Sequence, residues 1–138
     1  MFTNPPDDVI RALLSRRLTI AVVGCSPDPK RDSYRIAQLL LERGHRVLPV
    51  NPNAHEILGQ WAYPDLRALP RPIDLVDVFR RSEHVGPIVD DAIAIGAAAL
   101  WLQLGVIDEA AAARARRAGL TVIMDRCPAI EYQRLLGP

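Results

Sequence analysis

Along this chain, short runs of β-branched and aliphatic residues alternate with segments of helical apolar spacing. The apolar runs cover residues 18–23, 45–50, 73–79, 98–102 and 120–124. The helical segments that follow them cover residues 33–43, 82–95, 108–118 and 129–136. A continuous apolar run is typical of a strand buried on both faces. Strands that alternate with helices of about ten residues form βαβ units, so the pattern predicts a parallel sheet.

The rest of the chain adds little to this alternation. Residues 9–17 have the spacing of a short amphipathic helix, and residues 52–72 form one long connection with a short helix expected near 65–69. A length of 138 residues is typical of one domain, here residues 1–138. The sequence therefore predicts an α/β protein with a three-layer Rossmann-like fold and a mostly five-stranded parallel sheet, with right-handed crossovers.

Composition excludes several classes of protein. The 17 basic and 16 acidic residues give a formal net charge of +1, without the basic excess of a dedicated nucleic-acid binder. No apolar run approaches the ~20 residues of a membrane span, and the first residues lack a signal-peptide pattern. Two cysteines are too few for a disulfide scaffold or a four-ligand zinc site. We expect a soluble cytoplasmic domain that binds neither nucleic acid nor membrane.

In a parallel sheet of this type, ligands bind outside the carboxyl ends of the strands. The first run ends in Gly24, and the loop after it carries Ser26, Lys30 and Arg31. It has neither GxGxxG nor a P-loop pattern, but a small-residue turn into a helix offers free backbone N–H groups for phosphate. The alternative is a plain loop with exposed charges.

The end of the second run argues against a dinucleotide. An NAD-binding domain has Asp or Glu there to bind the ribose hydroxyls, whereas this chain has Val50, Asn51 and Pro52. An adenine can still lie against the rigid Asn-Pro turn. The alternative is that Asn51 and Pro52 only end the strand.

Two guanidinium groups follow the third run, after Phe79. Arg80 and Arg81 are predicted to lie opposite the first loop, and arginine side chains match phosphate oxygens well. The alternative is that one arginine pairs with Glu83 or Asp77 while the other is solvated.

The case for catalysis is weak. Cys25 lies near the start of a predicted helix, a setting that can lower a thiol's pKa, and Cys127 is either reactive or a small apolar plug. His45 lies at the opposite edge of the sheet and is interpreted as structural. Paired carboxylates, HExxH, GxSxG and CxxC are absent from the sequence, so no catalytic or metal-binding residue is assigned.

Four segments together carry a family resemblance. They are IAVVGCSPDPKRDSYRIAQLLLERGHRVLPVNP (20–52), IDLVDVFRRSEHV (73–85), ALWLQLGV (99–106) and VIMDRCPAIEY (122–132). The chain resembles the stand-alone CoA-binding domain family, whose relatives include the CoA-binding domains of the succinyl-CoA synthetase α subunit and of ADP-forming acetyl-CoA synthetases. The resemblance runs from about residue 9 to residue 136 and implies a Rossmann-like domain that holds coenzyme A across the strand ends.

The resemblance also implies which residues surround the ligand. Around the phosphates it places Gly24, Cys25, Ser26, Lys30 and Arg31; at the adenine and ribose Val50, Asn51 and Pro52; along the pantetheine and phosphates Phe79, Arg80 and Arg81; and further along the pocket Gln103 and Gly105. Synthetase activity does not carry over, because the synthetases use additional domains and a phosphorylated histidine that this sequence does not match.

The hypothesis from the sequence is a CoA or acyl-CoA binding module without self-contained catalysis, acting as a carrier, sensor or partner subunit. One alternative is a thiol-dependent enzyme that acts on CoA through Cys25 or Cys127. Another is a binder of a different nucleotide, such as NAD or ATP. Apolar positions on the helices can also support a protein partner or a homodimer.

Overall fold

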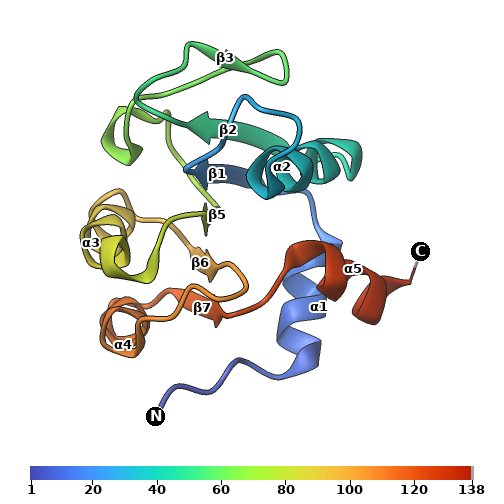
Figure 1. The fold of residues 1–138 in the computed structure, drawn as a ribbon. Helices are drawn as coiled ribbons and strands as arrows, with labels where there is room; N and C mark the ends of the chain where they lie inside the picture. Colours follow the sequence, from blue (N-terminus) through green and yellow to red (C-terminus); the bar gives the residue numbers. More distant parts are fainter. Residues whose placement is uncertain (138) are drawn as a thin grey trace.

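A computed structural model of the chain, in which residues 1–137 are described, contains a parallel sheet of five strands. In spatial order the strands are β2 (Arg46–Val50), β1 (Thr19–Val23), β5 (Leu75–Val78), β6 (Ala99–Leu102) and β7 (Thr121–Met124). All neighbouring strands in this sheet are parallel. The predicted α/β fold is therefore confirmed (Figure 1).

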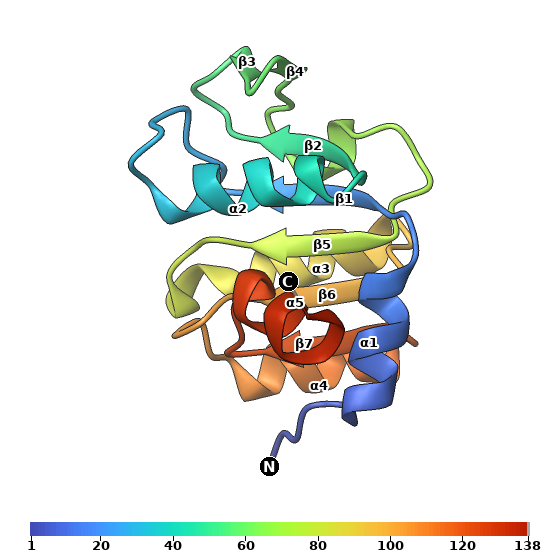
Figure 2. The same ribbon diagram turned by 90° about the vertical axis from the view of Figure 1, so that its right-hand side faces the viewer.

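Helices cover both faces of the sheet (Figures 1 and 2). On one face lie α1 (Asp7–Ser15), α2 (Asp32–Glu42) and α5 (Pro128–Leu136). On the other face lie α3 (Val85–Ala94) and α4 (Glu109–Arg117). The sheet with a helical layer on each side gives the three-layer, Rossmann-like arrangement expected from the sequence.

The continuous apolar runs are explained by the two helical layers. Within β1, Ile20 and Val22 pack with the α1, α2 and α5 side, and Ala21 and Val23 pack with the α3 and α4 side. These four residues are at most 7% exposed. Successive side chains of a strand point to opposite faces, so a strand covered on both faces needs apolar residues at every position.

One predicted helix begins later than its apolar spacing suggests. Instead of a single helix over residues 82–95, a 3-10 turn, η2 (Ser82–His84), precedes α3. The reason is Pro87, which lacks an N–H group and whose ring would collide with the carbonyl group of Glu83 in a continuous α-helix.

The long connection after β2 holds a small hairpin that the sequence did not predict. Strands β3 (Glu56–Ile57) and β4 (Gln60–Trp61) pair antiparallel, and both turn residues between them have positive φ. Two-residue strands carry almost no periodicity, and this turn lacks the usual Asn-Gly or Asp-Gly signal. The short helix expected near residues 65–69 is present as η1 (Leu66–Ala68).

The order of the strands fixes where a ligand can bind. The chain passes from β1 to β2 in one direction, then crosses back past β1 to β5 and continues to β6 and β7. The direction of winding therefore reverses between β1 and β5, and a crevice opens outside the carboxyl ends at such a point. Within residues 1–137, none of the helices is long and apolar enough to cross a membrane.

Candidate functional site

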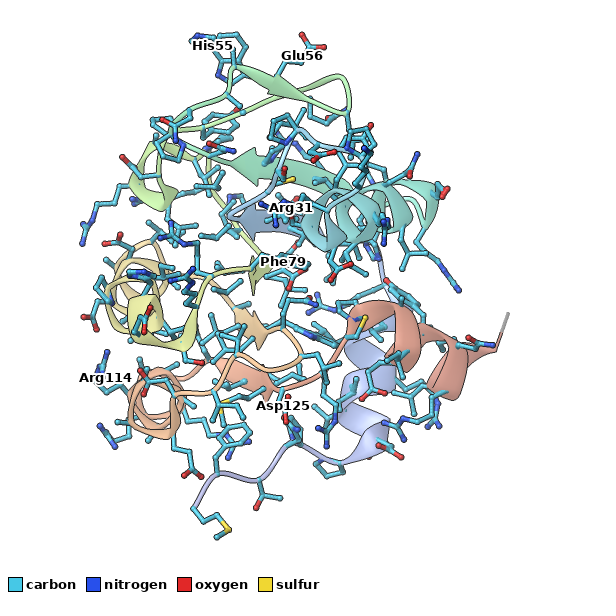
Figure 3. All side chains as sticks on the ribbon, in the orientation of Figure 1. Arg31, His55, Glu56, Phe79, Arg114 and Asp125 are labelled. Atoms are coloured by element: carbon cyan, nitrogen blue, oxygen red, sulfur yellow. The ribbon has the colours of Figure 1, made fainter. Side chains whose placement is uncertain are left out.

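A polar hollow of about 510 Å³ lies where β1 and β5 end. It is lined by Gly24, Ser26, Lys30, Arg31, Asp32, Ser33 and Phe79. Figure 3 shows Arg31, just before α2, next to Phe79, just after β5. The structure thus brings four of the predicted phosphate-contacting residues into one hollow, together with Phe79.

The loop after β1 is shaped by its own short polar side chains. The Ser33 hydroxyl accepts a hydrogen bond from the Ser26 N–H at 2.9 Å, and the Ser26 hydroxyl accepts one from the Asp28 N–H at 3.0 Å. Asp28 in turn accepts a hydrogen bond from the Lys30 N–H at 3.0 Å. These bonds hold the loop in a fixed shape at the start of α2, where backbone N–H groups favour an anion.

Gly24 lies where the carboxyl ends of β1, β2 and β5 come close together. Its N–H donates to the Val50 carbonyl oxygen of β2 at 3.0 Å. Its φ is +79°, and a Cβ at this position would overlap the Phe79 carbonyl oxygen after β5. Only glycine satisfies both the left-handed backbone and this close approach. The residue lets the ends of β1 and β5 lie close enough to enclose the hollow.

Basic side chains lie in the hollow and beside it. Lys30 and Arg31 lie before α2, and Arg80 and Arg81 follow β5; all four are exposed. The Arg81 guanidinium lies 3.8 Å from the Glu83 carboxylate, and both side chains are largely solvated, so this pair contributes little to stability. Asp77 has no ion pair with either arginine. The region therefore presents positive charge that an anion can use.

An apolar cleft of about 910 Å³ runs from this hollow between α2 and α5. It is lined by Asp32, Arg35, Ile36, Leu39, Glu42, Phe79, Arg80, Arg81, Gln103, Leu104, Val106, Cys127, Ala129 and Ile130. Asp32 and Phe79 line both the hollow and the cleft, which makes them continuous. The combined site can hold an elongated molecule with an anionic part and a less polar part.

Two buried polar side chains lie at this end of the sheet without hydrogen-bond partners among residues 1–137. The Gln103 side-chain oxygen is one, in a residue that is 7% exposed and lines the cleft. The second side chain is that of Asp77 in β5, and both of its carboxyl oxygens lack a partner. Burial raises the pKa of Asp77 well above its usual value, because the charged form of a buried carboxyl group loses its hydration.

The thiol hypothesis fails for Cys25. Its side chain is 0% exposed and lines neither the hollow nor the cleft. Burial, followed by the nearby Asp77, raises the pKa of Cys25 to about 12, the reverse of the lowering expected from its place before a helix. The thiol is therefore an apolar core group.

The residues after β2 support the first loop more than they line the hollow. The Asn51 side-chain amide donates to the Cys25 carbonyl oxygen at 2.9 Å, and its oxygen accepts from the Asn53 N–H at 2.8 Å. Val50 is buried and Pro52 is exposed beside them. Asn51 thus ties the second loop to the first.

Gly105 lies outside the hollow and the cleft, between two cleft-lining residues. Its N–H donates to the Asp125 carboxylate at 2.7 Å, which joins the loops after β6 and β7. The Ser82 hydroxyl accepts from the Ile107 N–H at 2.9 Å and extends the same connection to η2. These bonds position Leu104 and Val106 along the cleft.

Sequence reasoning missed the apolar walls of the cleft. Ile36 and Leu39 have ordinary helical spacing, and nothing in the sequence separates them from core residues. Leu104 and Ile130 are 61% and 56% exposed, although both are large and apolar. Such exposure marks a binding surface, but it becomes visible only when the fold is known.

His45 has the structural role that the sequence indicated. Its Nδ1 accepts a hydrogen bond from the Leu18 N–H at 3.0 Å, and its Nε2 bonds to the Tyr132 hydroxyl. Burial lowers the pKa of His45, and the nearby Arg17 and Arg43 lower it further. The neutral ring ties the start of the sheet to α5, far from the hollow.

Comparison with known proteins gives consistent results. Residues 18–133 match the family described as CoA binding domain. An uncharacterized protein of Bacillus subtilis, YneT, is 38% identical over 124 residues, which cover 90% of this chain and 92% of YneT. A hypothetical protein from Pyrococcus horikoshii has a solved structure with a TM-score of 0.92 and 38% identity, covering 99% of each chain.

A further match is to part of an enzyme subunit. The α subunit of ADP-forming acetate–CoA ligase II from Pyrococcus furiosus is 40% identical over 57 residues, which cover 41% of this chain and 12% of that subunit. The matched segment is therefore only a small part of that subunit. With the family match spanning most of the sequence, the conclusion is that this chain belongs to the CoA binding domain family.

Proposed function

We propose that this protein binds coenzyme A or an acyl-CoA reversibly, with its phosphates in the hollow and its pantetheine arm in the cleft. The observation that carries the proposal is the continuity of a basic hollow with an apolar cleft at the point where the sheet reverses its winding. CoA has the same division, with charged phosphates at one end and an uncharged, flexible arm at the other.

The phosphates are expected to contact the first turn of α2 and the four basic side chains around the first loop. Lys30 and Arg31 border the hollow from the side of α2, and Arg80 and Arg81 border the cleft beside it. Guanidinium groups bind phosphate oxygens through paired N–H groups, and the start of α2 adds favourable backbone dipoles.

The end of β2 favours CoA over NAD. Val50, Asn51 and Pro52 supply no carboxylate for the two free ribose hydroxyls of NAD. The CoA ribose instead carries a phosphate, which the surrounding positive charge suits. The adenine is expected beside Asn51 and Pro52, on the far side of the first loop from the cleft.

The pantetheine arm is expected to lie along Phe79, Leu104 and Val106. Its amide groups need hydrogen-bond partners, and the unpartnered Gln103 oxygen can accept one of them. The apolar walls then cover the methylene groups of the arm.

We expect the protein to act in the cytoplasm as a carrier or sensor of CoA, or as a CoA-binding subunit of a partner protein. Support comes from the match to part of an acetate–CoA ligase α subunit, in which a domain of this kind belongs to a larger protein. Cys25 is not expected to act as a nucleophile in this role, because its thiol is fully buried.

The test is binding measured by calorimetry and by thermal unfolding, with CoA, dephospho-CoA, NAD and ATP. We expect CoA to bind best and to raise the Tm by a few degrees when it is saturating. Replacement of Arg80 and Arg81 by alanine should weaken CoA binding by roughly 2–4 kcal/mol, or about thirty- to several-hundred-fold in Kd.

A matched control replaces Arg16 and Arg17 by alanine. This adjacent pair is also exposed, but it precedes β1 at the opposite end of the sheet. Its loss should leave the Kd for CoA unchanged. Equal effects of the two double variants, or tighter binding of NAD than of CoA, would refute the proposed site.

A further inference from the structure

The cleft contains one accessible thiol. Cys127 is the residue immediately before α5, is partly buried, and lines the cleft together with Ala129 and Ile130. Cys25, the other cysteine, is fully buried and lines neither the cleft nor the hollow. The structure therefore gives the two thiols opposite settings, although both occur in loops at the same end of the sheet.

We propose that Cys127 accepts CoA covalently, by thiol–disulfide exchange with a CoA disulfide whose nucleotide is held in the hollow. This inference rests on the proposed function, because the CoA phosphates would direct the sulfur end of the molecule into the cleft. The covalent product is a Cys127–CoA mixed disulfide.

The continuity of the hollow with the cleft supports the assignment of Cys127. The hollow and the cleft share Asp32 and Phe79, so a molecule anchored by its phosphates can extend without interruption toward α5. The thiol of CoA is the terminal group of its uncharged arm. In that arrangement Cys127 is the nucleophile that lines the part of the site where the arm is expected.

A second, independent feature points to a ligand in the cleft. The side-chain oxygen of Gln103 has no hydrogen-bond partner among the described residues, and the residue is 93% buried where it lines the cleft wall. A buried acceptor without a partner costs free energy, and an amide N–H of the pantetheine arm would satisfy it. Gln103 therefore provides a polar contact that can orient the arm toward Cys127.

The exchange balances without an external oxidant. The Cys127 thiol loses its proton to water, and the thiolate attacks one sulfur of the CoA disulfide. The bond between Cys127 Sγ and that sulfur forms as the sulfur–sulfur bond of the CoA disulfide breaks. The second CoA leaves as a thiolate and takes up a proton, so one disulfide is consumed and one is formed.

The test compares two disulfides at equal concentration, CoA disulfide and oxidised glutathione, with the full chain. Intact mass and peptide mapping follow the modification of each cysteine with time. We expect Cys127 to react with CoA disulfide roughly tenfold faster or more, because binding raises the effective concentration of the reacting sulfur. Desulfo-CoA, which lacks the thiol, should slow this reaction by competing for the site.

Two variants separate the covalent step from reversible binding. Cys127→Ser should form no adduct, and Cys25→Ala should form the adduct on Cys127 as the wild type does. If CoA stabilises the protein but both disulfides react equally, or the adduct forms on Cys25, the covalent inference is overturned and reversible binding stands. If CoA and desulfo-CoA do not bind at all, the proposed function fails and the inference fails with it.

Discussion

The buried carboxyl group of Asp77 gives a prediction that depends on the fold alone. Asp77 is 1% exposed in the central strand β5, and neither carboxyl oxygen has a partner among residues 1–137. Burial raises its pKa well above the usual value, because the charged form loses its hydration. We consider the substitution Asp77→Asn, which keeps the shape of the side chain and removes its charge.

The size of the effect follows from proton linkage. In the unfolded chain the Asp77 carboxyl group ionises near pH 3.9, whereas in the folded protein it holds its proton to a higher pH. Between these two pKa values the folded state binds one more proton, so the free energy of unfolding falls as pH rises. The fall is about 1.4 kcal/mol for each pH unit in that interval. The total therefore grows with each pH unit by which the folded pKa exceeds the unfolded one.

Thermal unfolding at a series of pH values measures this directly. An unfolding entropy of about 2.1 cal/mol/K per residue gives about 290 cal/mol/K for 138 residues. A difference of about 1.4 kcal/mol for each pH unit then corresponds to about 5 °C in Tm for each unit. We expect Asp77→Asn and the wild type to unfold at similar temperatures near pH 4, and the Tm of the variant to rise relative to that of the wild type as the pH increases above 4.

The control is Glu56→Gln, which removes an exposed carboxylate on the β3–β4 hairpin. It should follow the wild type across the whole pH range. A Tm difference between the wild type and Asp77→Asn that stays constant from pH 4 to pH 7 would refute the argument, because it would show that the folded protein does not hold the Asp77 proton.

Two further substitutions test the loop after β1 and the tie between the sheet and α5. Gly24→Ala should lower the free energy of unfolding more than Gly44→Ala does. Both residues have positive φ, so each substitution costs about 1–2 kcal/mol from left-handed strain, but only at Gly24 would the new Cβ also collide with the Phe79 carbonyl group. Equal losses of stability in urea unfolding would contradict this. Tyr132→Phe should cost roughly 1–3 kcal/mol at pH 7.5, because it leaves buried His45 without the partner of its Nε2. A Tyr132→Phe protein as stable as the wild type would show that this hydrogen bond has no net value.

The secondary structure was largely predictable because its signals are local. The apolar run ending in Val23 and the helical spacing of Ile36, Ala37 and Leu40 each report the burial of a few neighbouring residues. The exceptions have local causes too. Pro87 delays the start of α3, and the β3–β4 hairpin is too short to show a period.

The candidate site was only partly predictable, because the direction of a loop side chain is not a local property. Gly24, Ser26 and Arg31 were selected for their place after a strand, and the structure does bring them into one hollow. Cys25 stands between the first two of them, yet its side chain turns into the core. Strand order, which sequence spacing does not specify, decides that Phe79 lies opposite this loop.

By itself, then, the sequence determined the α/β alternation, the basic loops at the strand ends and the absence of an acidic residue after β2. Only the tertiary structure decided that α2 and α5 enclose an apolar cleft, that Cys127 lines it while Cys25 does not, and that Asp77 is buried without a partner. The physical reason is that periodicity reflects which face of an element is covered, whereas a cleft depends on how elements distant in sequence pack beside one another.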